Sequence, residues 1–320
     1  MQQTEEVFVG VDVAKAGLSS CIHGRTGRCD LTNDESGIAA WLATLPQQAM
    51  IAVESTGCYH QLLVRLAHGS GRRAFVLNAR DVYFYAKALG ARGKSDRTDA
   101  QVIARYLAEH HASLRSWEPA SDEQDRLQKL LRCRTGVVSK RESLRQVLRD
   151  VPQLDITALE RQFDALLDDI DAQVAALIAQ DADLKRKCAT LSTITGIGPL
   201  GSAMLGALFS RIAFANGDAV VAYSGLDPRP NDSGARTGRR RLSKRGNPEL
   251  RRQLYLAAFA ATRSKALGPL YQSIKAKGFK PTQAMVILAR KLLRVAWAVW
   301  KSEKAFDATM IGGLPACVKP

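Results

Sequence analysis

Two aspartates, Asp96 and Asp99, stand three residues apart where a helix is expected to begin. Residues at this spacing lie on one face of a helix, so the two carboxylates would point the same way. Capping explains acids at such a place, because they accept hydrogen bonds from first-turn N–H groups and suit the helix dipole. Two like charges also repel, and a cation between them would remove that repulsion. Within this window both interpretations stay open.

Two further acids interrupt apolar segments that are typical of buried strands. Asp12 lies in VFVGVDV (7–13), and Glu54 lies near the end of MIAVEST (50–56). A buried charge without a partner is costly, so each acid calls for an explanation. If the two strands are central and adjacent, the two carboxylates meet.

A metal site follows if the helix that carries the aspartate pair closes over these two strands. Carboxylate oxygens are hard ligands that favour Mg²⁺ or Mn²⁺. Two such ions about 4 Å apart can hold the attacking and leaving oxygens of a phosphodiester displacement. Lys15 and Lys94 flank the site and are predicted to contact phosphate. The predicted metal ligands are Asp12, Glu54, Asp96 and Asp99.

The elements that must position these acids are predicted from apolar periodicity and turn residues. Their order is three strands in a row, followed by alternating helices and strands. This order favours an α/β sheet with helices on its faces. The expected strands are 7–13, 17–23, 27–33, 50–56 and 73–79, and the expected helices are 37–45, 60–71, 81–90 and 98–111.

The composition changes near residue 120, where charged residues alternate with spaced Leu and Val. Apolar residues then recur at gaps of three and four over residues 159–177, which predicts a heptad-like seam. A long helical hairpin fits this pattern, and it would pack either on itself or against another copy of the chain. The seam residues are Leu159, Phe163, Leu166, Ile170, Val174 and Leu177.

Residues 191–208 resemble a helix-hairpin-helix element with Gly196 and Gly198 in its turn. Glycine there would let the backbone approach a phosphate, and N–H groups of the next helix could bind it. An ordinary helical turn is the alternative. Three helices are expected further on, at 248–264, 266–277 and 281–303.

Residues 222–252 form the segment most suited to phosphate, because they are rich in Gly, Pro, Ser and Arg. The predicted nucleic-acid contacts here are Arg229, Arg236, Arg239, Arg240, Arg241, Ser243, Lys244 and Arg245.

The totals favour a polyanionic partner. The chain has 320 residues, 46% of them hydrophobic, and a formal net charge of +15. Such a surplus indicates nucleic acid before an anionic membrane. Six scattered cysteines without a CxxC pair indicate reduced thiols in a cytoplasmic protein. No signal peptide is expected, because acids come first in MQQTEEVFVG and no long apolar run follows. No membrane segment is expected either, since Arg290, Lys291 and Arg294 interrupt the apolar run 284–300.

Four motifs, in order, resemble the DEDD-type insertion-sequence transposases, to which the pilin-gene invertases are related. They are GVDVAK (10–15), ESTGCY (54–59), KSDRTDA (94–100) and the arginine-rich tract 225–255. Each motif is short, but the likeness covers nearly the full chain in the right order. The resemblance implies an N-terminal RuvC-like domain, RNase H-like in fold, followed by a C-terminal domain that bears a serine.

By this resemblance, the four acids bind metal and Ser233 attacks the DNA, forming a covalent phosphoserine. The fold is expected to be α/β plus α: a mixed sheet with helices, a coiled-coil linker, and a mostly helical C-terminal domain with a helix-hairpin-helix-like element. The expected domains are 1–118, 119–188 and 189–320.

The resemblance also implies partners. These are donor and target DNA, a structured guide (bridge) RNA encoded beside the gene, and further copies of the chain, as dimers that pair into a tetramer.

Other readings compete with this one. Ser224, Ser243 or a metal-bound water could be the nucleophile in place of Ser233. A metal-dependent Holliday-junction-type endonuclease that uses water is one alternative function. A nucleic-acid-binding protein without catalysis is another, although an intact set of four acids argues against it.

Overall fold

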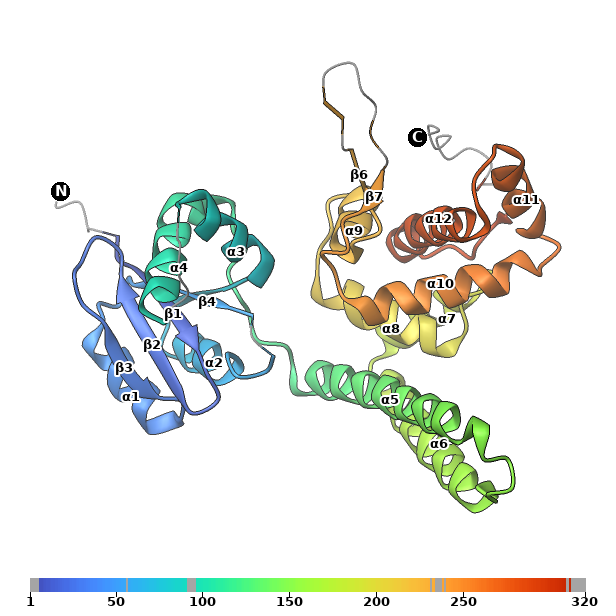
Figure 1. Cartoon of the computed structure of the whole chain (residues 1–320), viewed down its shortest axis with the longest axis horizontal. Coiled ribbons are helices and arrows are strands. Elements are labelled where there is room, and N and C mark those ends of the chain that lie inside the picture. Colours follow the sequence, from blue (N-terminus) through green and yellow to red (C-terminus); the bar gives the residue numbers. More distant parts are fainter. Residues whose placement is uncertain are drawn as a thin grey trace. The chain divides into compact units, whose positions relative to one another are not determined.

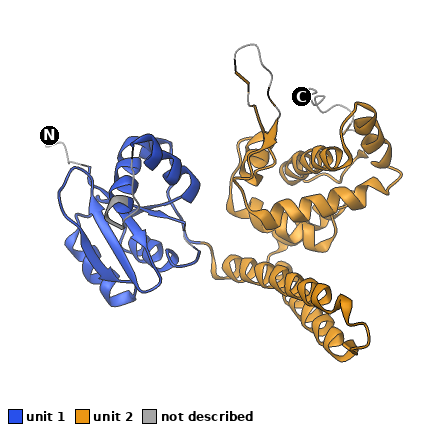
Figure 2. Ribbon diagram, in the orientation of Figure 1, with its two compact units in different colours: residues 1–119 blue, residues 120–320 orange. Residues whose placement is uncertain are grey.

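The chain forms two compact units, residues 1–119 and 120–320, coloured separately in Figure 2. The computed structural model describes residues 6–55, 57–90, 96–230, 232–233, 238, 240–308 and 311, and leaves the side chains of residues 96–98 undescribed. Lys94, Arg236, Arg239 and the side chain of Asp96 therefore lie outside the described residues.

Unit 1 is built on a mixed five-stranded sheet in the order β3-β2-β1-β4-β5. β1 pairs antiparallel with β2 and parallel with β4, so it lies at the centre of the sheet (Figure 1). The mixed α/β sheet expected from the sequence is thereby confirmed. The strands are β1 (Phe8–Val13), β2 (Gly17–Ile22), β3 (Cys29–Thr32), β4 (Met50–Glu54) and β5 (Arg73–Leu77).

Helices cover both faces of this sheet. The face that holds Val9 and Val11 packs against α1 and α2, and the opposite face, with Ala52 and Phe75, packs against α3 and α4. Alternation along β1 therefore places Gly10 and Asp12 on the α3/α4 face. The helices are α1 (Glu35–Thr44), α2 (Gln61–Gly69), α3 (Ala79–Ala88), α4 (Asp96–His110) and the 3₁₀ turn η1 (His111–Ser113).

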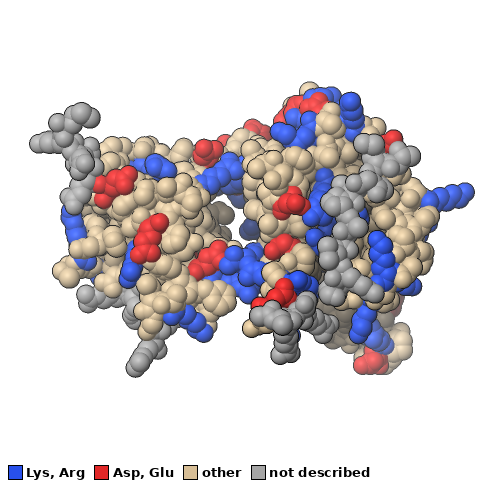
Figure 3. Space-filling model, turned by 90° about the horizontal axis from the view of Figure 1, so that it is seen from above, with Lys and Arg blue, Asp and Glu red and all other residues tan. Residues whose placement is uncertain are grey.

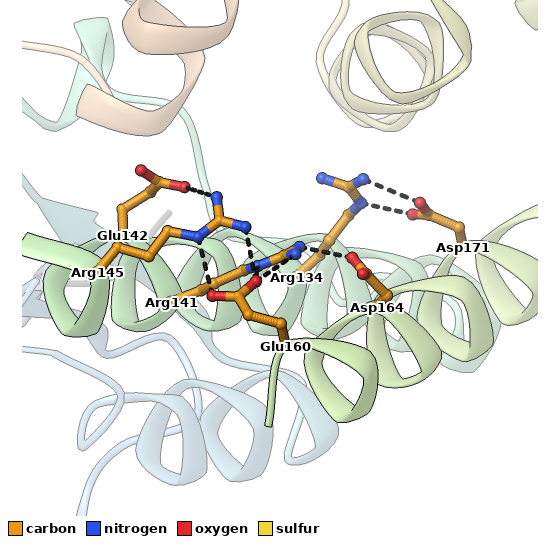
Figure 4. Close-up of polar contacts among 7 residues, drawn as sticks. All are labelled: Arg134, Arg141, Glu142, Arg145, Glu160, Asp164 and Asp171. Atoms are coloured by element: carbon orange, nitrogen blue, oxygen red, sulfur yellow. Dashed lines mark hydrogen bonds and ion pairs between the residues drawn. The ribbon is translucent and has the colours of Figure 1, made fainter. Parts of the chain in front are cut away.

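Unit 2 begins with a long helical hairpin of α5 (Asp122–Val147) and α6 (Thr157–Gln180), joined through η2 (Leu148–Asp150). Ser121 and Gln124 form a capping box that fixes the start of α5. Arginines of α5 face acids of α6 along the hairpin, as Figure 4 shows. The pairs are Arg134 with Asp171, Arg141 with Glu160 and Asp164, and Arg145 with Glu160.

The apolar seam of α6 differs from the expected one. Ile170, Val174 and Leu177 are buried with residues of α5, as a hairpin that packs on itself requires. Leu167 is also buried, whereas Leu166 remains 46% exposed and Leu159 40% exposed. Within the hairpin, Leu159 and Leu166 therefore do not belong to the buried seam, because gaps of three and four also allow Leu167 to face α5. Pairing of the seam with another copy stays a prediction.

The rest of unit 2 is a helical domain around one large core to which α8, α9, α10 and α12 contribute. The expected packed helix at 284–300 is confirmed, since Leu288, Leu292 and Leu293 are fully buried. The elements are α7 (Ala182–Ser192), α8 (Pro199–Arg211), α9 (Gly217–Ser224), α10 (Pro248–Thr262), α11 (Gly268–Ala276), α12 (Pro281–Ser302) and the strands β6 (Pro228–Arg229) and β7 (Arg241–Leu242). In the described part of the chain, no helix is both long and apolar enough to cross a membrane.

Candidate active site

Strand register brings Asp12 and Glu54 together. β1 and β4 are parallel neighbours, with Val11 opposite Val53, so the two acids occupy the next position on each strand. Neighbouring residues of paired strands point to the same face, and here it is the face covered by α3 and α4. The expectation that these two strands are central and adjacent is confirmed.

Gly10 determines how closely α4 approaches this face. A Cβ atom at Gly10 would lie 2.2 Å from both the Ala100 carbonyl oxygen and the Ala104 nitrogen. The backbone of α4 therefore rests directly on β1, two residues before Asp12. Glycine inside a strand permits such a contact, because it has no side chain.

The direction of α4 brings its first turn toward the two acids. The rings of Phe8, at the start of β1, and His111, just after α4, lie 4.9 Å apart. Since Gly10 contacts the middle of the helix, α4 runs antiparallel to β1. From that contact, Asp12 lies about 6.6 Å further along β1 and Asp96 about 6 Å back along the helix from Ala100. The start of α4 thus reaches the end of β1 that carries Asp12.

The described acids at this edge are half-buried: Asp12, Glu54 and Asp99 all have intermediate exposure. Asp96 is the first residue of α4. Lys15 is exposed just after β1. Among the residues whose side chains are described, no group of three His, Cys, Asp or Glu side chains could hold a metal ion. Carboxylate oxygens suit Mg²⁺. The three expected ligands with described side chains, Asp12, Glu54 and Asp99, do not form such a group without Asp96.

A polar row crosses the sheet through Asp12. Ser19 is opposite Asp12 on β2, and Asp30 is opposite Ser19 on β3. Ser19 Oγ donates to Asp30 Oδ1 at 2.7 Å, and Arg28 Nε donates to the same oxygen at 2.5 Å. These two hydrogen bonds, Ser19 first, hold the pKa of Asp30 below its ordinary value. The outer acid of the row is thus satisfied within the protein.

Asn33 joins the two loops that follow the acidic strands. Its Nδ2 donates to the carbonyl of Ala14, after β1, at 3.0 Å and to that of Tyr59, after β4, at 3.1 Å. Sequence analysis did not single out this residue. Its position directly after a polar strand end gives only the signal of a turn, and the contacts arise from tertiary structure.

Ser233 lies on a short ribbon in unit 2. β6 and β7 pair antiparallel, with Arg229 opposite Arg241, and Ser233 is an exposed residue in the loop between them. Asp232 anchors the loop, because it pairs with Arg240 at 2.7 Å and accepts a hydrogen bond from the Gly238 nitrogen at 3.0 Å.

The base of the ribbon is closed by polar contacts. The Ser243 hydroxyl donates to Asp227, and its backbone nitrogen donates to the Asp227 carbonyl at 2.9 Å. Arg251 donates to the carbonyls of Ser224 and Gly246, and so ties α10 to the ribbon.

The two rival serines are both buried: Ser224 is 0% exposed and Ser243 is 3% exposed. The Ser224 hydroxyl donates to the Val221 carbonyl at 2.7 Å. Ser243 does not cap α10, since Asn247 does. Its contact with phosphate stays a prediction, although the hydroxyl is engaged with Asp227. Of the three candidate serines, Ser233 is the exposed one.

The described basic residues of the tract face solvent to different degrees. Arg241, Lys244 and Arg245 are exposed, and Arg229 and Arg240 are half-buried. Lys and Arg lie on both units in the view of Figure 3, with Asp and Glu among them. The surplus of positive charge therefore does not by itself locate a binding site.

In the turn between α7 and α8, the packing of the chain explains why residue 196 is glycine. Gly196 has a φ of 95° and a Cβ there would lie 2.3 Å from the Ala257 carbonyl oxygen, so the turn packs on α10. Gly198 precedes α8 as its N-cap and has open space around it. A contact of either glycine with phosphate stays a prediction.

A comparison with solved structures finds RuvC of T. thermophilus in complex with a Holliday junction substrate. The likeness covers 35% of this chain and all of that chain, at 14% identity and a TM-score of 0.27. At that score it leads to no conclusion about the site.

Comparison with known sequences is more informative. Residues 9–158 match the family model for DEDD transposases of IS110, and residues 188–272 match the model described as Transposase IS116/IS110/IS902 family. The pilin gene-inverting protein of Moraxella bovis is 27% identical over 94% of this chain and 98% of its own length. A protein of insertion element IS116 from Streptomyces clavuligerus is 22% identical over 94% and 96%. The chain therefore belongs to the IS110 family of DEDD transposases, enzymes that recombine DNA.

Proposed function

We propose that this transposase cuts and rejoins DNA strands of an insertion sequence through an acidic metal site in unit 1 and the hydroxyl of Ser233. The observation that carries the proposal is the meeting of Asp12 and Glu54 on neighbouring strands, under a helix whose first turn bears Asp99. Residues 1–118 would be the RuvC-like catalytic domain, 119–188 the linker and oligomerisation segment, and 189–320 the serine-bearing domain.

Asp12, Glu54, Asp96 and Asp99 would hold two Mg²⁺ or Mn²⁺ ions. Bound there, the ions would supply positive charge at the oxygens of the reacting phosphodiester. The protein's own part is to fix the acids: β1 and β4 do so by register, and α4 does so through its backbone contact at Gly10.

Ser233 would attack the phosphorus of the DNA backbone. The Oγ–P bond forms as the P–O bond to the neighbouring nucleotide breaks. The serine hydroxyl gives its proton to water, and the departing oxygen takes a proton from water. Arg229, Arg241 and Lys244 near the loop would neutralise charge on the phosphate. Attack on the phosphoserine by a second strand's hydroxyl releases the serine and rejoins the DNA.

The partners follow the family resemblance: donor and target DNA, a structured bridge RNA that pairs with both, and dimers that join into a tetramer. Such assembly could bring the serine of one copy to the acids of another. The exposed Leu159 and Leu166 of α6 offer apolar surface that a second copy could cover.

The second candidate function is a Holliday-junction-type endonuclease in which water attacks and Ser233 is only a loop residue. It uses the same acids, so metal-dependent cleavage alone does not separate the two functions. A covalent protein–DNA species does.

The test incubates the full-length protein with Mg²⁺, RNA transcribed from the element's flank, and end-labelled donor and target DNA, followed by a denaturing gel. We expect a labelled band at the size of the protein that disappears in Ser233→Ala and in Asp12→Asn. Cleavage should fall by at least about 10³-fold in both variants, since each removes a group that acts in the reaction.

Ser273→Ala is the matched control, because Ser273 is an exposed serine of unit 2 on α11, away from the ribbon. It should retain the band. Metal-dependent cutting by Ser233→Ala, without any covalent band in the wild type, would instead establish the water-using endonuclease.

A further inference from the structure

The outward face of α3 carries two aromatic and two basic side chains at helical spacing: Arg80, Tyr83, Phe84 and Lys87. Tyr83 is 53% exposed and Phe84 is 48% exposed. Their rings meet edge to face, with centroids 5.4 Å apart. Positions i, i+3, i+4 and i+7 share one side of a helix, so the four side chains form one continuous surface.

Each cation on this surface lies over a ring. The Arg80 guanidinium is 5.5 Å from the centroid of Phe84, and the Lys87 ammonium is 4.7 Å from that of Tyr83. The order along the face is cation, ring, ring, cation. Contacts of this kind hold the rings in place while leaving about half of each exposed to a ligand.

The packing of unit 1 does not account for these rings. α3 buries its other side: Val82 is 4% exposed and packs with residues of α4. Tyr85, on that inner side, donates to Glu109 at 2.5 Å, and burial raises the pKa of its phenol to about 12. Adjacent large rings that remain outside a core in this way are typical of a binding surface.

The position of α3 relates the surface to the acids. α3 begins directly after β5, capped by Asn78, and Leu77 at the end of β5 is opposite Glu54. The helix therefore begins at the carboxyl ends of the parallel strands, where Glu54 and Asp12 lie. The start of α3 therefore lies near these acids.

We propose that this face of α3, the residues Arg80, Tyr83, Phe84 and Lys87, binds unpaired DNA next to the cleavage site. Bases stack on the two rings. Such stacking tolerates any base sequence, because every base has a flat apolar face. The two cations contact the phosphates on either side. The bound strand would be the one that is cut at the acidic site. This inference therefore rests on the proposed function for the choice of strand.

The test measures binding without cleavage. Full-length protein is titrated in EDTA, at about 0.2 M salt to suppress general charge attraction, against a fluorescein-labelled oligothymidine of about 12 nucleotides. The same titration is repeated with a duplex and with oligouridine of equal length. Fluorescence anisotropy gives each Kd.

Three double variants are compared. Tyr83→Ala with Phe84→Ala removes the rings, and Tyr83→Leu with Phe84→Leu keeps apolar side chains but not flat rings. Tyr255→Ala with Phe259→Ala is the matched control, since these residues are 37% and 45% exposed on α10 of unit 2. We expect both Tyr83/Phe84 variants to weaken oligothymidine binding about tenfold or more and duplex binding less than about twofold.

Four results would overturn the inference: unchanged oligothymidine binding in the alanine variant, full retention in the leucine variant, equal loss on duplex, or a loss confined to oligouridine. A loss that occurs only in the α10 control would also overturn it. Because the readout needs neither metal nor Ser233, failure here leaves the cleavage assay intact. Circular dichroism melting confirms that each variant folds, which exposed positions permit.

Discussion

The two candidate halves of the active centre are built in different ways. At the acidic edge of unit 1, backbone meets backbone: strand register sets Asp12 beside Glu54, and α4 rests on Gly10 without a side chain between them. On the ribbon of unit 2, side chains hold the loop: Asp232 pairs with Arg240 and Ser243 bonds to Asp227. The difference would suit the two proposed tasks, because metal ligands must be fixed within about 0.5 Å, whereas a nucleophile on a loop could adjust to its DNA.

Among changes that leave the acids and Ser233 themselves in place, the largest effect is expected where backbones touch. In Gly10→Ala the new Cβ would lie 2.2 Å from two backbone atoms of α4, so the helix must shift. We expect a loss of about 1–3 kcal/mol in the stability of unit 1 from overpacking. Displacement of the acids on α4 should also reduce cleavage by about 10²-fold.

Hydrogen exchange read by mass spectrometry on peptides of β1 and α4 measures the first effect, because it resolves unit 1 from unit 2. Gly17→Ala is the control on the same sheet, since its Cβ would make only an ordinary contact of 3.5 Å with Leu31. Unchanged protection in Gly10→Ala would show that the backbone contact is not what fixes α4.

A smaller effect is expected on the ribbon. Arg240→Gln and Asp232→Asn each break the ion pair beside Ser233, whose partners are 34% and 40% exposed. Stability should change by less than about 1 kcal/mol, as for other exposed pairs. If the pair positions the serine, both variants should slow formation of the covalent species by a similar factor, on the order of tenfold.

Single-turnover rates at saturating DNA measure this factor, with Kd determined separately. A slower rate in Arg240→Gln alone, accompanied by weaker DNA binding, would mean that Arg240 contacts phosphate. It would also mean that the ion pair with Asp232 does not position Ser233.

The smallest effect is expected at the outer end of the polar row. Ser19 and Arg28 already satisfy Asp30, so Asp30→Asn should leave metal-dependent cleavage within about twofold of the wild type, in contrast to Asp12→Asn. Its contribution lies in stability. Because the pKa of Asp30 is lower in the folded state, the ionised carboxylate stabilises the protein above the ordinary value of 3.8, and this is lost as the pH falls through the folded pKa.

Melting temperatures of wild type and Asp30→Asn between about pH 3 and pH 6 should therefore converge at the acid end. A gap that stays constant over this range would mean that the charge of Asp30 contributes nothing, and a large loss of cleavage would place Asp30 among the metal ligands.

Much of unit 1 could be predicted from its sequence, because periodicity of two marks strands and glycine marks helix ends. The predicted strand 7–13 and the observed β1 (Phe8–Val13) differ by one residue, and all five strands of the sheet are found in the predicted order. In unit 2, the expected helix starts at Pro248 and Pro281 are also confirmed.

Other features were beyond prediction. α9 is only eight residues long, and β6 and β7 have two residues each, too few for any period to show. In α6, the leucine buried within the hairpin is Leu167, next to the predicted Leu166, because both fit the spacing. For the site, the acids could be found because they break apolar strands, but the contacts of Asn33 with Ala14 and Tyr59 depend on how distant loops meet.

The antiparallel course of α4 along β1 also orders events during synthesis. Asp12 leaves the ribosome early, whereas Asp99 follows only after the whole sheet has been made. Until α4 arrives, only α3 is available to cover the face that holds Ala52 and Phe75, and α4 does not yet lie against β1. An N-terminal domain commonly folds as a unit once its last element is available. The same docking step that completes the cover of the apolar face would thus complete the proposed set of acids, so a chain that ends before α4 would lack both a finished unit 1 and the proposed metal site.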